Sequence, residues 1–195
     1  MVGGAALREA DRWRGWLAPT LVAIALPAMS AERLVVEGGC RDGEPNGAYL
    51  LRAGDGHLRV AGAFAKGRRT GTFVFWAERG ARVAVVPYDT DRKAGTIAVW
   101  FAPPAPGKDA PRKSESAYVE GRLHGDKRSW HRNGNPRTDL RYEQGELVVA
   151  RAWTEAGAQL PETKARELAA RDRVTDEQFY ATLETLVTEH RPQCE

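Results

Sequence analysis

The sequence predicts a mainly β protein: stacked antiparallel β-hairpins with a period of about 24 residues, and a C-terminal helical segment that packs back on the sheet. Three observations predict this fold. Tryptophans and other aromatic residues recur at a nearly fixed spacing, glycines recur with them, and the composition changes after residue 160. The chain has 195 residues, which is enough for a domain with a real core.

Three series of residues carry the repeat. The tryptophans are Trp76, Trp100, Trp130 and Trp153. A glycine stands five residues before each of the first three: Gly71, Gly95 and Gly125. An aromatic series follows the same intervals almost exactly: Phe64, Tyr88, Tyr118 and Tyr142. The one longer interval, between the second and third members of each series, is explained by a proline-rich insertion at 102–114, which cannot continue a strand.

Each unit contains two β-rich runs around a glycine-containing turn, which is a hairpin signature. Asn133-Gly134 is the strongest of these turn signals. Asp91 stands where other units have glycine, three residues after the aromatic position, so this position is predicted to need a positive φ. We therefore expect hairpin repeats over 47–160, preceded by an N-terminal lead-in at 31–46.

Residues 161–195 form a different kind of segment. They lack glycine and are rich in helix-forming residues. We expect helices near 162–172 and 175–190, the second beginning at a capping box of Thr175 and Gln178. Helices that run back along the sheet would supply its second layer and bring Cys194 to Cys40. One disulfide is the simplest expectation for the only two cysteines, and two free thiols or an intermolecular link are the alternatives.

The first thirty residues resemble a targeting signal. An arginine-containing start is followed by an uncharged run, Trp16 to Ala28, of about 13 residues, whereas a bilayer span needs roughly 20. Small residues at Ala28 and Ser30 then match a cleavage site. We expect residues 1–30 to be a signal peptide cut after Ser30, giving a periplasmic or secreted protein. An uncleaved membrane anchor or a buried helix is the alternative.

Composition argues against several classes of function. The chain has 29 Lys+Arg and 26 Asp+Glu, a net charge of +3, which argues against a dedicated nucleic-acid binder. Two cysteines without a Cys-x-x-Cys pair do not make a zinc site. No serine stands in a nucleophile-elbow motif, and the histidines show no metal-ligand spacing. We expect no catalytic set, no metal and no cofactor, so the chain is not predicted to be an enzyme.

The motif that joins these series resembles a known repeat. Gly62, Phe64, Gly67, Arg69 and Gly71, followed by a tryptophan and a glycine, are similar to MORN-type repeats, in the bacterial variant found in YwqK-family antitoxin-like proteins. The same pattern recurs from Tyr118 and from Tyr142, and the likeness extends over more than half of the chain. The resemblance implies stacked hairpins that serve as a binding or scaffolding surface without catalytic residues.

The tryptophans have two interpretations. They either fill the core of the sheet or line an open groove with arginines, where both residue types favour binding. The candidate surface then consists of the four tryptophans with Arg69, Arg128, Arg137 and Arg141. We expect an exported, non-enzymatic protein-binding or scaffolding surface in the bacterial envelope, with a protein partner, no nucleic acid and no membrane contact after signal cleavage. An antitoxin or immunity protein, and a binder of envelope polymers or lipid headgroups, are the alternatives.

Overall fold

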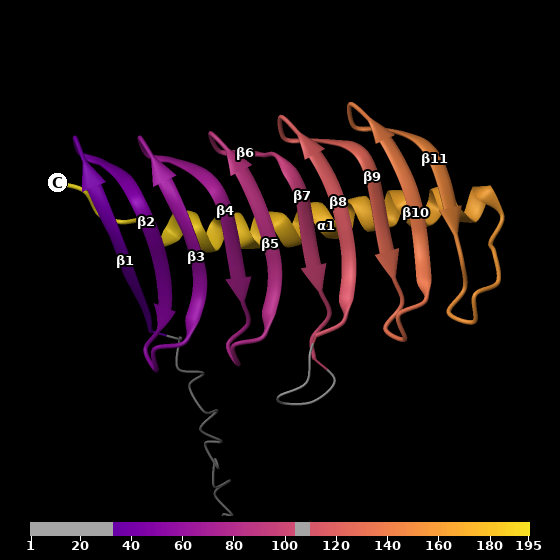
Figure 1. Cartoon of the computed structure of the whole chain (residues 1–195), viewed down its shortest axis with the longest axis horizontal. Helices are drawn as coiled ribbons and strands as arrows, with labels where there is room; N and C mark the ends of the chain where they lie inside the picture. Colours follow the sequence, from indigo (N-terminus) through magenta and orange to yellow (C-terminus); the bar gives the residue numbers. More distant parts are fainter. Residues whose placement is uncertain (1–32, 104–109) are drawn as a thin grey trace, which may run out of the picture. The chain divides into compact units, whose positions relative to one another are not determined.

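Each repeat unit forms antiparallel strands that are joined by tight turns. The computed structural model describes residues 33–103 and 110–195, and the predicted signal peptide with its cut after Ser30 lies outside the described residues. Within the described part, eleven strands form one antiparallel sheet in the order β1-β2-β3-β4-β5-β7-β8-β9-β10-β11, and β6 pairs with β5 (Figure 1). The predicted stack of hairpins is therefore confirmed.

The strand bounds follow the predicted units. They are β1 (Leu34–Arg41), β2 (Glu44–Ala53), β3 (Leu58–Ala65), β4 (Arg68–Trp76), β5 (Arg82–Asp89), β6 (Arg92–Lys93), β7 (Gly95–Trp100), β8 (Arg112–Val119), β9 (Arg122–Trp130), β10 (Pro136–Glu143) and β11 (Glu146–Ala152). The stretch 31–46 is more than the predicted lead-in. It contains β1, which pairs with β2 from Leu34 opposite Ala53 to Arg41 opposite Glu44.

The turn residues adopt the predicted backbone conformation. Asp91 has a φ of 65° and the preceding Thr90 a φ of 50°. At the other turns of this edge the second residue is glycine, as at Gly67 with a φ of 68°. A tight hairpin with two positive φ angles matches the twist of the strands it joins, so Asp91 stands at a position that glycine fills elsewhere.

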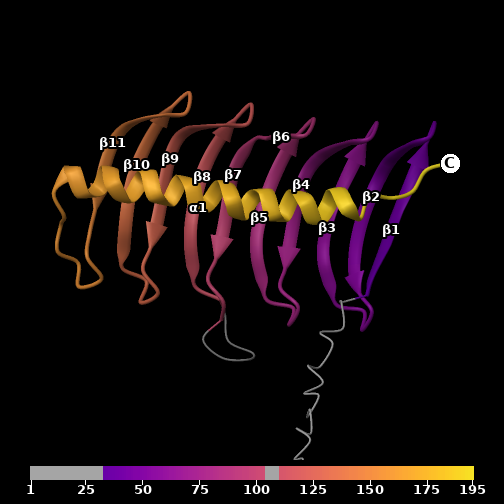
Figure 2. The same cartoon turned by 180° about the vertical axis from the view of Figure 1, so that it is seen from behind.

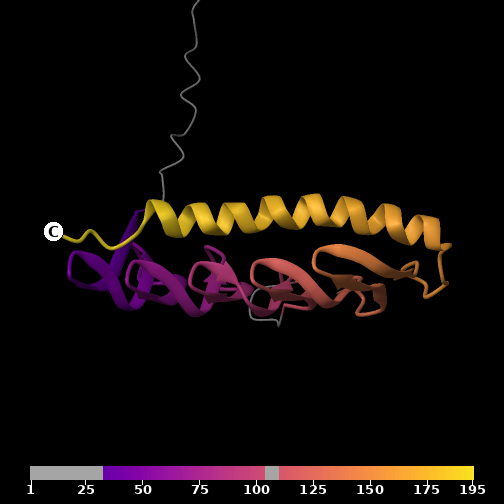
Figure 3. The same cartoon turned by 90° about the horizontal axis from the view of Figure 1, so that it is seen from above.

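The C-terminal segment is one helix, not two. It runs without a break as α1 (Glu162–Glu189). Thr175, predicted to start a second helix, instead donates its hydroxyl to the carbonyl of Arg171 at 3.1 Å, which is the bond of a residue inside a helix. The apolar face that begins at Phe179 is real, but no residue such as proline or glycine interrupts the first half. The helix crosses the strands on one face of the sheet (Figures 2 and 3).

The core lies between this helix and the sheet. The aromatic series is buried there, with Phe64, Tyr88, Tyr118 and Tyr142 no more than 9% exposed. Tyr180, Leu183 and Val187 of α1 pack against the same cluster. The four tryptophans of the repeat are not members of this cluster, so the interpretation that they fill the core is wrong.

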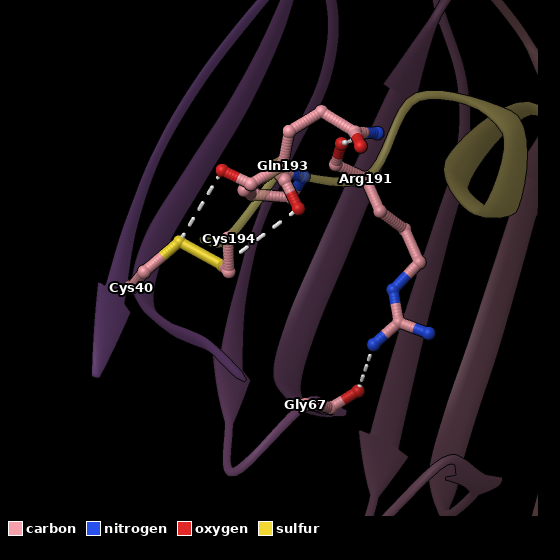
Figure 4. The surroundings of a disulfide bond; sticks show 6 residues. Cys40, Gly67, Arg191, Gln193 and Cys194 are labelled. Atoms are coloured by element: carbon pink, nitrogen blue, oxygen red, sulfur yellow. Dashed lines mark hydrogen bonds between the residues drawn. A yellow bond between two sulfur atoms is a disulfide. The ribbon is translucent and has the colours of Figure 1, made fainter. Parts of the chain in front are cut away.

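A disulfide closes the first strand to the C-terminus, as predicted. Cys40 and Cys194 are bonded with their Cα atoms 5.8 Å apart (Figure 4). Cys40 stands one repeat before Phe64, so β1 carries a half-cystine where the later units carry an aromatic ring. Pro192 lies against Gly38 so closely that a Cβ there would meet its Cγ at 2.6 Å. The C-terminal tail is thus held on the helix side of β1.

Candidate functional site

The sheet face away from α1, called the open face below, carries no helix or strand among the described residues (Figure 3). Neighbouring residues in a strand point to opposite faces. The residues between the buried positions therefore belong to the open face. Cross-strand pairing joins them into continuous rows, because each strand keeps the register of its repeat.

One row of the open face is apolar across five strands. It pairs in the order Leu50, Ala61, Val74, Val85 and Ala98. Leu50, Val74 and Val85 are only partly buried although they are large aliphatic side chains. The sequence analysis did not single out these residues. The sequence did contain a signal for this row. Leu50, Val74 and Ala98 each lie two residues before the tryptophan position of their repeat unit, and Ala61 and Val85 lie on the strands paired with them.

The same row becomes charged over the next four strands. It continues from Ala98 to Glu115, Arg128, Asp139 and Arg151. Arg128 Nε lies 3.5 Å from Asp139 Oδ1, and Arg151 Nη1 lies 3.3 Å from Asp139 Oδ2. These side chains are largely exposed, so each pair contributes little stability. Positive and negative side chains alternate along this row, so they pair with one another on the open face.

A row of tryptophans and arginines borders the apolar row. Trp100 lies between two guanidinium groups, with the Cζ atoms of Arg82 and Arg112 at 4.2 and 4.3 Å from its ring. A cation over an indole face is attracted by the ring quadrupole. Arg112 also binds Glu115 at 2.6 Å, whereas Arg82 forms no ion pair with the described residues. This Arg-Trp-Arg stack positions the indole beside the apolar row.

The predicted binding residues divide between the two faces. Strand alternation places Trp76 and Trp100 on the open face, where Arg128 and Arg141 are exposed. Trp130 also walls a cavity that reaches Asp172 of α1, and Trp153 lies just past the end of β11. The structure places Arg69 and Arg137 on the helix side instead. Arg69 lies over the ring of Tyr88 at 4.4 Å. Arg137 forms two hydrogen bonds with the carboxylate of Asp172, and this bonding raises the pKa of Arg137. These two arginines therefore do not line the open face.

The helix side has a polar region that the sequence analysis missed. Lys127 is 2% exposed and binds Asp176 of α1 at 2.6 Å. Beside it, the buried hydroxyls of Ser129 and Thr138 are hydrogen-bonded at 2.6 Å. A small cavity of about 130 Å³ opens next to this pair and is walled in part by Phe101 and Trp130. The sequence signal for this region is Lys127, a lysine at a strand position that faces the core. Its partner, Asp176, is distant in the sequence and lies on the helix.

The described residues contain no metal centre and no membrane-spanning helix. No group of three or more His, Cys, Asp or Glu side chains in the described parts is arranged to hold a metal ion. His131 contacts the carbonyl of Trp153 at 3.0 Å, and His124 accepts from the amide of Gln144 at 3.3 Å. Within the described parts, α1 is not apolar enough to cross a membrane.

No protein-family model matches the chain, and no curated protein matches it significantly. The resemblance to MORN-type repeats therefore stays a prediction. The stacked hairpins themselves are shown by the strand pairing.

Proposed function

We propose that this chain is an exported, non-enzymatic repeat protein that binds another protein on its open face. The observation that carries the proposal is the apolar row from Leu50 to Ala98 beside the Arg82-Trp100-Arg112 stack. A contiguous row of partly exposed aliphatic side chains is typical of a surface that a partner protein covers. Tryptophan and arginine are the residues most often found at the energetic centre of protein interfaces.

Export is supported by two independent features. Small residues at Ala28 and Ser30 follow an uncharged run. The Cys40–Cys194 disulfide persists most readily in an oxidising compartment. A mass measurement of the protein recovered from the envelope tests this part of the proposal. A species that begins at Ala31 and lacks two cysteine hydrogens is expected, and a full-length species with two free thiols would contradict it.

Binding on the open face is tested by crosslinking in envelope extracts with matched variants. Val85→Glu puts a charge into the apolar row, and Trp100→Ala removes the stacked ring. Val174→Glu is the control, because Val174 is 55% exposed on α1 and receives the same substitution. We expect the crosslinked partner to be lost with the first two variants and kept with the control. Equal recovery from all three, with unchanged melting temperatures, would overturn the proposal.

A further inference from the structure

Two of the four aromatic positions in the repeat hold a guanidinium group both over the ring and on a turn carbonyl, and at a third a guanidinium binds the equivalent carbonyl. Each ring lies three residues before a turn residue with a positive φ at the end of the hairpin. The first case is Phe64 with Gly67. Arg191 lies over the ring of Phe64 with its Cζ at 5.4 Å from the centroid, and its Nη2 donates to the carbonyl of Gly67 (Figure 4).

The second case is Tyr88 with Asp91. The Cζ of Arg69 lies 4.4 Å from the centroid of Tyr88, and its Nη2 donates to the carbonyl of Asp91 at 3.3 Å. The carboxylate of Asp91 also accepts from Nε of Arg69 at 2.9 Å. Although burial alone raises the pKa of Asp91, these hydrogen bonds from Arg69 bring it below its ordinary value.

The third case is Tyr142 with Gly145. Nη1 of Arg173 donates to the carbonyl of Gly145 at 3.3 Å, and its Nε binds Glu177 at 3.0 Å. Burial raises the pKa of Tyr142, and the nearby charge of Arg173 opposes that rise. A turn carbonyl and a carboxylate thus bind the guanidinium here as they do at Asp91.

The three arginines come from unrelated parts of the chain. Arg191 belongs to the C-terminal tail, Arg69 to β4 and Arg173 to α1. No shared sequence places them at these sites. The repeated backbone creates a niche of one carbonyl and one aromatic ring, and a guanidinium fills it because its planar donors match the carbonyl and its face stacks on the ring.

The fourth niche, at Tyr118 and Gly121, holds no guanidinium in this way. The carbonyl of Gly121 accepts no hydrogen bond from the described residues. A cavity of about 330 Å³ opens there, lined in part by Tyr118, Gly121, Glu146 and Tyr180. Lys93 stands where Arg69 stands in the preceding unit. Its ammonium group turns aside to Glu184 at 3.1 Å and lies 5.3 Å from the ring of Tyr180.

The positive and negative side chains around this cavity balance one another. Lys93 is already paired with Glu184, and Arg173 with Glu177 at 3.0 Å. The remaining charged side chains of the lining are Glu146 and Arg122, and neither forms an ion pair with the described residues. Glu146 begins β11, after the turn at Gly145, and lines the same cavity as Tyr118 and Gly121, so its carboxylate is available to a guanidinium bound there.

We propose that the Tyr118–Gly121 niche binds the guanidinium of an arginine side chain presented by another protein. The niche lies on the helix side at the turn edge, so it is separate from the open face and stands or falls independently of the function proposed for that face. Its ligand is inferred from the occupied counterparts at Phe64 and Tyr88. Lysine is a poorer occupant, as the displaced Lys93 already indicates.

The test is a titration of the full exported chain with N-acetyl-arginine methylamide, followed by the NMR shift of the Gly121 amide. N-acetyl-lysine methylamide is the matched probe. We expect a saturable shift with the arginine probe and about tenfold weaker binding of the lysine probe. Equal responses to both probes, or no saturable shift with either, would overturn the proposal.

Two variants complete the test. Lys93→Arg places a guanidinium in the niche from within the chain, as Arg69 does one unit earlier, and we expect about tenfold weaker binding of the arginine probe. Lys164→Arg makes the same change on the outer surface of α1 and leaves binding unchanged. Glu146→Gln removes the unpaired carboxylate and weakens binding by about threefold. Unchanged binding in both Lys93→Arg and Glu146→Gln, with folding intact, would contradict the assignment.

Discussion

The first and second halves of the sheet use the same backbone for different contacts. On the helix side, the residues three positions before the tryptophans are Phe73 and Ile97 in the first half, and Lys127 and Ala150 in the second. On the open face the central row changes from aliphatic to charged residues between Ala98 of β7 and Glu115 of β8. Both changes fall at the proline-rich insertion. The turn residues and the aromatic series therefore determine the backbone conformation, whereas the residue types at the central strand positions differ between the two halves.

The two halves hold α1 by different physical means. The first half buries Tyr49, Phe64, Phe73 and Tyr88 in edge-to-face contacts such as Phe73 on Tyr88, with ring centroids 5.4 Å apart. Such burial has little directionality. The second half buries the ion pair of Lys127 with Asp176, whose strength depends on geometry, whereas the ion pairs of the first half with Glu184 are more exposed. We expect the first half to supply most of the stability and the second half to fix the position of the helix along the sheet.

The largest expected effect comes from breaking the aromatic half. Phe73 is fully buried, and Phe73→Ala should lower the free energy of unfolding by about 4 kcal/mol. Chemical denaturation measures this loss. Val174→Ala on the exposed side of α1 is the control and should change stability by less than about 0.5 kcal/mol. If Phe73→Ala lowers the free energy of unfolding no more than Val174→Ala does, the first half does not supply most of the stability.

Removing the disulfide comes next. Cys40→Ala with Cys194→Ala opens a link between the first strand and the end of the chain, and the expected loss is about 3 kcal/mol. Because the tail is anchored to β1, hydrogen exchange should rise first in β1 and in the last turns of α1. Uniformly faster exchange along the whole sheet would contradict a local anchoring role.

The buried ion pair of the second half should cost less to break. Lys127→Met leaves the Asp176 carboxylate, whose side chain is 14% exposed, without its partner. The expected loss is about 2 kcal/mol, because partial exposure lets water solvate that charge. Adding Asp176→Leu should recover most of it, since a well-packed apolar pair replaces an ion pair at little cost. If the double variant is no more stable than Lys127→Met, the unpaired charge of Asp176 is not the cause of the lost stability.

The smallest effect concerns one hydroxyl in the aromatic half. Tyr49 donates to the carbonyl of His190 at 3.0 Å, and Tyr49→Phe should cost about 1 kcal/mol at neutral pH. Burial raises the pKa of Tyr49 to about 12, so the stability tied to its neutral form is complete below about pH 10 and is lost as pH rises toward that pKa.

Tyr49→Phe should therefore reduce the fall of stability between about pH 10 and 12. Equilibrium unfolding measured at a series of alkaline pH values checks this. Tyr88, Tyr118 and Tyr180 also have pKa values raised by burial, so a residual slope is expected in the variant. An unchanged slope would mean that Tyr49 ionises as easily in the folded chain as in the unfolded one.

Local patterns predicted most of the fold. The spacing of the tryptophans and of Tyr88 and Tyr118 predicted the hairpins, and Asp91 marked a turn that needs positive φ. The cysteine count with a returning helical segment predicted the disulfide. The break near Thr175 was wrong, because a capping motif inside a helix with good propensity on both sides does not end it.

The candidate site was harder to predict, since it depends on which face each residue joins. Arg69 and Arg137 were grouped with the tryptophans by proximity in sequence, but the helix draws both to the other face through Glu184 and Asp172. Those partners lie far along the chain, and no spacing rule connects them. The apolar row escaped notice because valine and alanine in a strand look the same whether a partner or a core covers them.

The central claim is that protein binding belongs to the open face of the first half. Site-specific photocrosslinking tests it most directly, with a photoreactive amino acid placed at Val85 in one variant and at Arg151 in another, in the native envelope. We expect a discrete protein adduct from position 85 that disappears when Trp100→Ala is added, and no such adduct from position 151. Equal adducts from the two positions, or an adduct from position 151 alone, would contradict it.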